Sequence, residues 1–213
     1  MSFPQPLPIF PLGLVLYPHI KVPLHIFEER YKAMIAYCRE ADSPFGLVLF
    51  NEGRMEQVGS TARVVRIIEE YDDGRLDIIV QGEQRFTIDE LHHDKAYLQA
   101  RVTVIDEPAD GNVDLGQKER AITQHMKLLE LAGRTVRPSI YESVPFVSYV
   151  LAENAGLNPE QKQRLLELRS EGERIGFLIS HFEELIPRVE QIEDVRRKVR
   201  SNGHFKDFPP ESL

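Results

Sequence analysis

The sequence predicts an α+β fold, in which an N-terminal antiparallel pseudo-barrel is followed by a C-terminal helical subdomain. Short strand-like runs, some alternating and some wholly apolar, fill most of residues 45–105. Helical periodicity and capping signals fill the chain beyond residue 113. Several antiparallel strands with one early helix are typical of a small curled sheet or barrel. We therefore divide the chain into a β domain with one helix (1–110), a helical bundle subdomain (111–205) and a flexible tail (206–213).

Prolines dominate the start of the chain. Six of the fourteen fall within the first 23 residues, interleaved with apolar side chains, so this stretch cannot form a helix. We expect short extended pieces that pack on the core, with the prolines confined to edges and turns. Apolar residues then recur at helical spacing and predict an amphipathic helix over about 26–41: Phe27, Tyr31, Met34, Ile35 and Cys38.

Two strand-like segments follow this helix. Residues 45–50 are almost wholly apolar and predict a buried strand. Residues 58–68 predict a longer strand, in which the adjacent apolar pairs Val64-Val65 and Ile67-Ile68 indicate a bulge or burial on both faces.

A hairpin and a last strand complete the predicted sheet. The turn signal at residues 72–74 joins the long strand to residues 76–80 in an antiparallel hairpin. Gly82 marks a bend. Residues 97–105 alternate apolar and polar side chains, so one face of this strand meets water.

The remainder of the chain predicts helices. The first spans about 114–132, with Ile122, Met126 and Leu129 facing inward and Gly133 as its stop.

The second predicted helix begins at Ser143 or Val144, has Pro145 in its first turn and ends at Gly156. A capping pattern at 158–161 starts the next.

The last predicted helix carries an apolar seam of about two and a half heptads, from Ile175 to Ile192. Packing within its own domain is favoured over a dimer zipper, because the seam is short.

Composition and charge narrow the class of protein. Acidic side chains number 34 and basic ones 26, which works against a protein that follows nucleic-acid phosphates. The single cysteine, Cys38, rules out an intramolecular disulfide or a multi-cysteine zinc site, so the sequence suits a reducing compartment without requiring one. The start of the chain resembles no secretory leader, and no segment has the length of apolar sequence that a membrane helix needs, so we expect a cytoplasmic protein.

No pattern in the sequence points to catalysis. The glycine-rich phosphate-binding motifs and the G-x-S-x-G nucleophile elbow are both missing. His181 and Glu184 have the i, i+3 spacing of bundle metal sites, but no matching pair occurs on another predicted helix. His125 lies beside an apolar stripe, where packing with a hydrogen-bond partner is the usual role. We predict no enzyme activity, no catalytic residue, no cofactor and no metal.

The order of motifs in the first half is specific enough to compare with a known family. The motifs are LPIFPL (7–12), VLYP (15–18), VPL (22–24), FEERY (27–31), VGSTARV (58–64), DG (73–74), VQG (80–82) and RF (85–86). Over about residues 7–106 this pattern resembles the N-terminal substrate-binding domain of Lon proteases. The helical remainder is similar in kind to the bundle that follows in Lon, with weaker motifs.

The resemblance implies a PUA-like pseudo-barrel with a helical subdomain, which recognises unfolded or damaged protein segments and delivers them to an attached ATPase and protease. The chain has no Walker motif and no Ser-Lys protease domain, so it resembles a stand-alone protein of this type, and proteolysis would belong to a partner. A related domain in cereblon, a ubiquitin-ligase substrate receptor, recruits proteins without chemistry of its own. We expect a non-enzymatic peptide-binding module that acts as an adaptor in protein quality control, without a membrane partner.

Candidate contact residues lie at the start of the early helix. Phe27, Arg30 and Tyr31 would meet an extended peptide, which can bind by strand addition or in an apolar groove. Phe27 and Tyr31 also fit the buried stripe of that helix, so for both of them a core role is favoured over a contact role.

RNA binding is the alternative function, because PUA-like folds also bind RNA. A sheet face that carries four arginines would form a local basic strip: Arg63, Arg66, Arg85 and Arg101.

Overall fold

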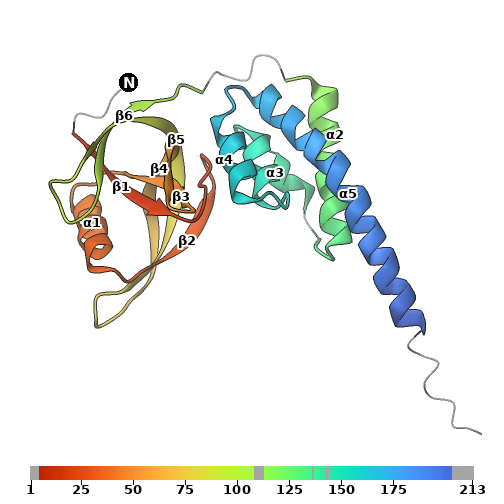
Figure 1. The fold of residues 1–213 in the computed structure, drawn as a ribbon, viewed down its shortest axis with the longest axis horizontal. Helices are drawn as coiled ribbons and strands as arrows, with labels where there is room; N and C mark the ends of the chain where they lie inside the picture. The colour runs from red at the N-terminus through yellow and green to blue at the C-terminus, as the bar shows by residue number, and fades with distance from the viewer. Residues whose placement is uncertain (1–4, 108–112, 136, 143, 203–213) are drawn as a thin grey trace, which may run out of the picture. The chain divides into compact units, whose positions relative to one another are not determined.

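The computed structural model describes residues 5–107, 113–135, 137–142 and 144–202 (Figure 1). Its six strands are β1 (Leu7–Leu12), β2 (Lys21–Ile26), β3 (Phe45–Asn51), β4 (Arg54–Glu70), β5 (Leu76–His92) and β6 (Gln99–Val104). Its helices are α1 (Glu29–Glu40), α2 (Leu115–Leu131), the 3-10 turn η1 (Pro138–Tyr141), α3 (Val147–Glu153), α4 (Pro159–Glu167) and α5 (Glu171–Asn202). The predicted α+β class with a helical C-terminal part is confirmed. The predicted tail (206–213) and residues 108–112, around the predicted domain boundary at 110/111, lie outside the described residues.

The strands close into a barrel. Their order is β2-β5-β4-β3-β1-β6, and β6 also pairs with β5, so five strands form a closed ring with β2 added to it. The length of β5 makes this possible: residues 76–81 pair with β2, and residues 86–92 pair with β6. One pairing departs from the predicted antiparallel arrangement, because β1 runs parallel to β3.

Three of the N-terminal prolines lie in short strands, in line with the predicted extended pieces: Pro8 and Pro11 in β1 and Pro23 in β2. β1 pairs with β6 through residues 7–8 and with β3 through residues 9–12, so Pro8 and Pro11 each face a partner strand on one side only. Pro23 lies in β2, which pairs only with β5. A missing backbone donor is tolerated at such positions.

Gly82 is needed for a close approach of two backbones. β5 continues through this residue, and its register with β4 shifts next to it. A Cβ atom at Gly82 would lie 2.2 Å from the carbonyl oxygen of Tyr17. The Gly82 carbonyl accepts a hydrogen bond from His19 N at 2.8 Å, and Gly82 N donates to Ile20 O at 3.0 Å. The segment after β1 is therefore fastened to β5 at the place where β5 changes partners.

Helix α1 buries the stripe that the sequence predicted: Tyr31, Met34, Ile35 and Cys38. It begins three residues later than predicted, at Glu29 instead of about residue 26. Phe27 therefore precedes the helix and does not share the direction of its stripe.

Helix α2 buries a different face from the one that the sequence predicted. Its N-cap Asp114 accepts a hydrogen bond from Gly116 N at 2.9 Å. The buried residues are Ala121, His125, Leu128 and Leu129. Met126 is 39% exposed, so its predicted inward position is wrong. The face was misjudged because polar His125 takes the inward place that an apolar residue was expected to fill.

The next two helices were predicted with unequal success. The predicted helix from Ser143 or Val144 begins only at Val147 in α3; Ser143 lies outside the described residues, and Pro145 precedes the helix. The predicted cap of α4 is confirmed, because Asn158 and Gln161 form a reciprocal capping box.

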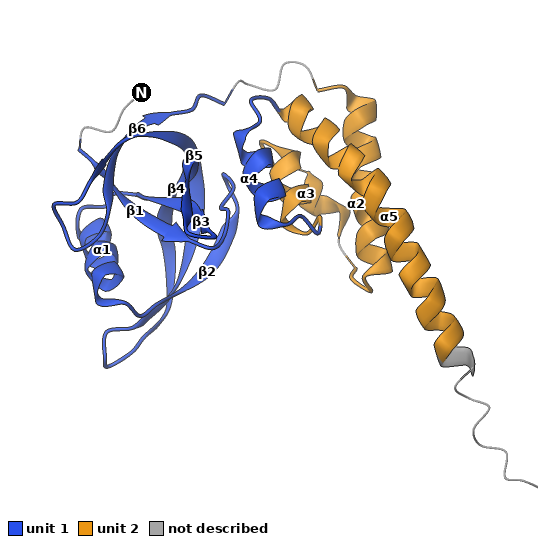
Figure 2. Ribbon diagram, viewed as in Figure 1, with its two compact units in different colours: residues 1–111, 156–170 blue, residues 112–155, 171–213 orange. Residues whose placement is uncertain are grey.

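Contacts group the chain into two units, residues 1–111 with 156–170 and residues 112–155 with 171–213 (Figure 2). Helix α4 thus belongs with the barrel, whereas the sequence division at 110/111 stays a prediction. Tyr17 Oη donates to Lys162 O at 3.2 Å, and Gln163 Nε2 donates to Val58 O at 3.0 Å. Both bonds tie α4 to the barrel.

Arg85 is the largest charged group in the interior of this unit, with no exposed surface. Its Nη1 donates to the carbonyl oxygens of Leu166, in the last turn of α4, and of Leu168, its C-cap, at 2.6 and 2.7 Å. Its Nε forms an ion pair with Glu107. One buried cation therefore joins β5, the end of α4 and the segment after β6, and satisfies carbonyls that a helix end leaves free.

A buried polar cluster organises the second unit. Ser148 N, in the first turn of α3, donates to Glu171 Oε1 at 2.8 Å, and Ser148 Oγ donates to Glu171 Oε2. Arg174 Nε donates to Ser148 Oγ at 3.0 Å, and its guanidinium carbon lies 4.5 Å from the centroid of the Tyr149 ring. Glu171 and Arg174 are 4% and 0% exposed.

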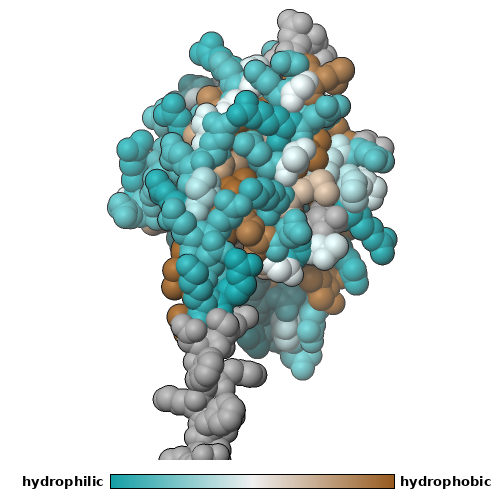
Figure 3. All heavy atoms as spheres, turned by 90° about the vertical axis from the view of Figure 1, so that its right-hand side faces the viewer, coloured by the Kyte–Doolittle hydropathy of each residue, from teal (hydrophilic) through white to brown (hydrophobic). Residues whose placement is uncertain are grey.

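The apolar seam of α5 is buried only in its first half. Ile175, Leu178 and Phe182 are buried, whereas Ile192 is 52% exposed. The face in Figure 3 is mostly hydrophilic, with hydrophobic residues in separate patches. Within the described residues, no helix has the combination of length and hydropathy that crossing a membrane requires.

Candidate functional site

The structure separates the three predicted contact residues. Phe27 is 59% exposed, and Arg30 is exposed on the first turn of α1. Tyr31 is only 6% exposed, and its ring centroid lies 4.1 Å from that of Phe10 in the core. The guanidinium carbon of Arg30 lies 4.6 Å from the centroid of the Tyr31 ring. Phe27 and Arg30 are therefore accessible to a ligand, while the buried Tyr31 ring packs against the guanidinium group of Arg30.

Phe27 belongs to an exposed aromatic cluster with His25 and Tyr71, which we call the Phe27 surface. The His25 and Phe27 rings stack with centroids 5.9 Å apart, and the Tyr71 ring meets His25 edge-on at 6.2 Å. Asp77 holds two of the three members, through Tyr71 Oη at 2.7 Å and His25 Nδ1 at 2.6 Å. Aromatic groups held in this way lose little conformational entropy when they bind.

The Asp77 hydrogen bonds also shift two pKa values. The bond from Tyr71, followed by that from His25, lowers the pKa of the Asp77 carboxyl. The same bond to Asp77 is the largest contribution that raises the pKa of Tyr71, to about 12. At neutral pH, Tyr71 therefore stays protonated and Asp77 stays ionised, so the tyrosine hydroxyl donates its hydrogen bond to a carboxylate.

A second feature is an unpaired strand edge. β3 pairs with β4 only through residues 54–62, so residues 63–70 of β4 pair with β5 alone; we call residues 63–70 the β4 edge. Among the described residues, no other strand pairs with it. Alternate residues of an antiparallel strand direct their backbone groups to either side, so N–H and C=O groups of the β4 edge point away from β5.

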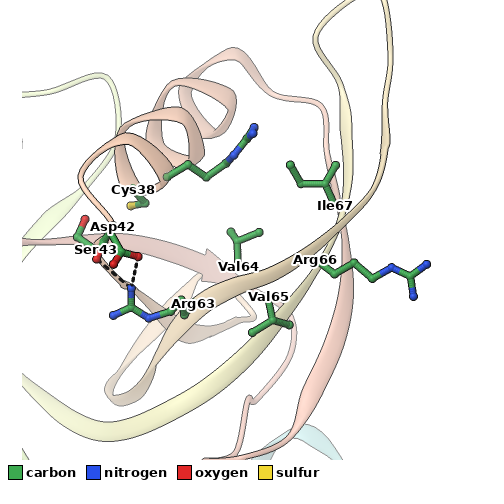
Figure 4. Close-up of a pocket in the computed structure, with 9 residues that line it drawn as sticks. Cys38, Asp42, Ser43, Arg63, Val64, Val65, Arg66 and Ile67 are labelled. Atoms are coloured by element: carbon green, nitrogen blue, oxygen red, sulfur yellow. Dashed lines mark hydrogen bonds and ion pairs between the residues drawn. The ribbon is translucent and has the colours of Figure 1, made fainter.

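Helix α1 runs beside the β4 edge and is linked to the hairpin at both ends. Near the end of the helix, Arg63 Nη1 donates to Asp42 Oδ1 at 2.8 Å. Near its start, Lys32 Nζ donates to Asp73 O at 2.8 Å, in the turn after β4. Between these two links lies a pocket of about 310 Å³, the β4 pocket (Figure 4). It is lined by Cys38, Arg39, Asp42, Ser43, Arg63, Val64, Val65, Arg66 and Ile67.

The β4 edge is bulged at two apolar residues. The register with β5 shifts between Val64 and Arg66 and again between Ile67 and Glu69, which leaves Val65 and Ile68 as the extra residues. In Figure 4, Val64 and Ile67 lie on the side of β4 that faces α1, and Val65 lies on the other side. Val65 and Ile68 are 44% and 52% exposed. This confirms the bulge that the apolar pairs predicted, and its consequence is two exposed apolar side chains.

The β4 pocket has a positive rim. Arg63 is neutralised by Asp42 and by Glu83, whose Oε1 lies 2.8 Å from Arg63 Nε. Within the described part of the chain, neither Arg39 nor Arg66 has an ion-pair partner, and both are exposed. Cys38 is a poor nucleophile here, because burial raises the pKa of its thiol to about 11. The pocket is therefore suited to binding acidic groups and not to thiol chemistry.

The arginines proposed for RNA do not form a strip. Arg85 is fully buried, Arg63 is paired with two carboxylates, and Arg101 Nη2 lies 2.8 Å from Glu90 Oε2. The observation that favoured RNA in the sequence thus has no counterpart in the described structure.

The histidines singled out in the sequence have structural partners. His125 is buried, with Nδ1 2.8 Å from the Tyr141 hydroxyl, as expected for a packing histidine. His181 Nε2 lies 2.9 Å from Ala155 O. Among the described residues, no group of three or more His, Cys, Asp or Glu side chains is placed to hold a metal ion.

A small closed barrel with an exposed aromatic cluster and an open, arginine-rimmed strand edge defines a binding module. Residues 6–184 match the family described as the ATP-dependent protease La (LON) substrate-binding domain. The chain belongs to this family.

Curated relatives are Lon proteases. The chain is 26% identical to Lon protease of Cytophaga hutchinsonii over 95% of its own length and 26% of the relative's. It is 22% identical to Lon protease of Escherichia coli K12 over 91% of its length and 26% of that protein's. The chain thus spans about a quarter of the length of these relatives.

Solved structures share the fold. A crystal structure of a Lon N-terminal domain protein from Xanthomonas campestris superposes with a TM-score of 0.66 at 24% identity, over 83% of this chain and 98% of that one. The N-terminal domain of Lon protease from the Mycobacterium avium complex gives a TM-score of 0.60 at 21% identity, over 85% and 100%.

Proposed function

We propose that this protein is a non-enzymatic module that binds exposed or unfolded protein segments and serves as an adaptor in protein quality control. The observation that carries this proposal is the match of residues 6–184 to a substrate-binding domain family. The Phe27 surface and the β4 edge supply features that peptide-binding proteins use, namely exposed aromatic side chains and unpaired backbone groups.

The Phe27 surface is our proposed peptide-contact region. Phe27 contributes apolar area, Arg30 contributes a cation for carboxylate or carbonyl groups, and buried Tyr31 positions Arg30. Degradation of a bound segment would be performed by a partner ATPase and protease, and not by this unit. A reducing compartment such as the cytoplasm suits its buried free cysteine.

The direct test is a titration followed by fluorescence anisotropy. A labelled, permanently unfolded polypeptide is titrated with the full chain, and a labelled RNA of similar size is measured in the same buffer. We expect saturable binding of the polypeptide that depends weakly on salt. No binding of the polypeptide would overturn the proposal, and salt-sensitive binding of the RNA alone would favour the alternative function.

Phe27→Ala tests the contact region. We expect the Kd for the unfolded polypeptide to rise about fivefold, because exposed aromatic anchors carry much of the energy of such interfaces. Phe50→Ala is the matched control, since Phe50 is 46% exposed on β3 of the same barrel. Equal effects of the two substitutions on the Kd would show that the Phe27 surface is not the binding site.

A further inference from the structure

We propose that the β4 edge binds a short, extended segment of acidic and apolar residues, which adds to the sheet as a strand between β4 and α1. This inference rests on the proposed function and names its ligand chemistry and its binding mode. It is carried by the coincidence of an unpaired strand edge, a pocket beside it and a positive rim.

The pocket lies where β4 extends past the first residue of β3. That residue, Phe45, pairs with Ala62, and the chain before it turns away through Ser43 and Asp42 toward α1. The β4 pocket therefore occupies the line along which β3 would continue beside residues 63–67. A strand placed there would take up backbone donors and acceptors of β4 that have no partner strand among the described residues.

The two bulges limit what can bind. A regular open edge would pair with any strand, including the same edge of another copy, and bulges prevent this by interrupting the ladder. Because Val65 and Ile68 interrupt it within a few residues, only a short segment can pair continuously. A pocket of about 310 Å³ also has room for a few residues only. The bulges further turn Val65 and Ile68 outward, where apolar side chains of the ligand can cover them.

The charge of the rim selects the ligand. The chain as a whole carries a formal charge of −8, so a segment with carboxylates is repelled by most of the molecule. Arg39 and Arg66 are exposed at the pocket without ion-pair partners among the described residues, so they give such a segment a local site. Alternation of acidic and apolar residues in the ligand matches the two faces of an added strand.

Labelled peptides test the binding mode. The first is a ten-residue peptide that alternates Val and Glu, and the second has Lys in place of Glu. Two further peptides carry N-methyl groups on one or the other alternate set of backbone amides, because N-methylation removes the donor that pairs with a strand edge. We expect the Lys peptide to bind at least tenfold more weakly. One N-methylated peptide should lose binding by a similar factor, and the other should retain it.

Protein variants locate the site. Arg66→Glu should weaken binding of the Val-Glu peptide about tenfold and favour the Lys peptide, since it reverses one charge of the rim. Arg101→Glu is the matched control, because Arg101 is an exposed arginine on β6 of the same barrel. Circular dichroism and thermal unfolding of each variant confirm that it is folded. Equal effects of the two substitutions, or equal binding of both N-methylated peptides, would overturn the inference.

The unfolded polypeptide separates this inference from the proposed function. If it binds and is displaced by the Val-Glu peptide, both are supported. If it binds but neither Arg66→Glu nor the Val-Glu peptide affects it, the proposed function stands and the β4 edge is not the site. If neither ligand binds, both fail.

Discussion

One buried residue, His125, should make the stability of this protein depend on pH. His125 is fully buried, and desolvation, with a smaller contribution from Arg134, lowers the pKa of its imidazole from 6.5 to about 4. The unfolded chain therefore binds more protons than the folded chain between these two values, and the free energy of unfolding falls as the pH is lowered through this range. We expect His125 to account for a loss of about 2 kcal/mol between pH 7 and pH 5.

Urea unfolding at pH 7, 6 and 5 checks this prediction. His125→Gln keeps a hydrogen-bonding side chain but has no titratable group, so its stability should depend less on pH over this range. The same dependence in the original chain and in the variant would show that His125 does not protonate on unfolding.

The buried ion pair of Glu171 and Arg174 should contribute strongly to stability. Glu171 accepts hydrogen bonds from Ser148 N and Oγ, and its Oε2 lies 3.1 Å from Arg174 Nη2. Glu171→Gln removes the carboxylate that Arg174 Nη2 meets at 3.1 Å, which should lower the free energy of unfolding by about 3 kcal/mol. The double variant Glu171→Gln, Arg174→Met removes the cation too, so it should be more stable than the single variant. Chemical unfolding measures both, and an additive or larger loss in the double variant would contradict this account.

Secondary-structure elements place strict demands on particular glycines. Gly82→Ala would force a Cβ atom to within 2.2 Å of Tyr17 O, against a segment that is hydrogen-bonded to Gly82 itself. We expect a loss of about 3 kcal/mol of stability, because rigid backbone must move. Gly176→Ala, in α5, is the control: nothing lies within 4 Å of the new methyl group, so stability should rise by roughly 0.5–1 kcal/mol. Thermal unfolding of both variants tests the contrast, and a stable Gly82→Ala protein would contradict it.

The elements also show what the sequence could reveal about this fold and its site. Local periodicity predicted α1, β3 to β6 and the α4 cap, because each depends on residues close together in the chain. It did not reveal the parallel pairing of β1 with β3, which joins segments more than 30 residues apart. It placed Phe27 on the helix stripe because its spacing fits, although the helix begins after it. The open β4 edge could not be foreseen either, because an edge is defined by where the partner strand stops.

At the scale of the whole chain, the first compact unit is discontinuous. Residues 156–170 return to the barrel and supply α4, whose carbonyl end holds the buried Arg85. The sequence suggested a division at 110/111, because the composition changes there from strands to helices. Periodicity cannot show that a later helix packs back on an earlier barrel.

A fragment of residues 1–111 should therefore be much less stable than the barrel in the full chain. Without α4 it exposes the surface that α4 covers. Arg85 keeps its ion pair with Glu107 but loses the Leu166 and Leu168 carbonyls, and a buried donor left without its acceptor costs about 1–3 kcal/mol. A second fragment, in which a flexible glycine-serine linker joins residues 1–107 to 156–170, should recover most of the loss. Replacing Arg85 by Met should harm the linked fragment more than the short one, because only the linked fragment offers the guanidinium group the Leu166 and Leu168 carbonyls. Urea unfolding of the four proteins gives the comparison. Equal stability of the two fragments would mean that the barrel folds without α4, and that the division at residue 110 describes an independent domain.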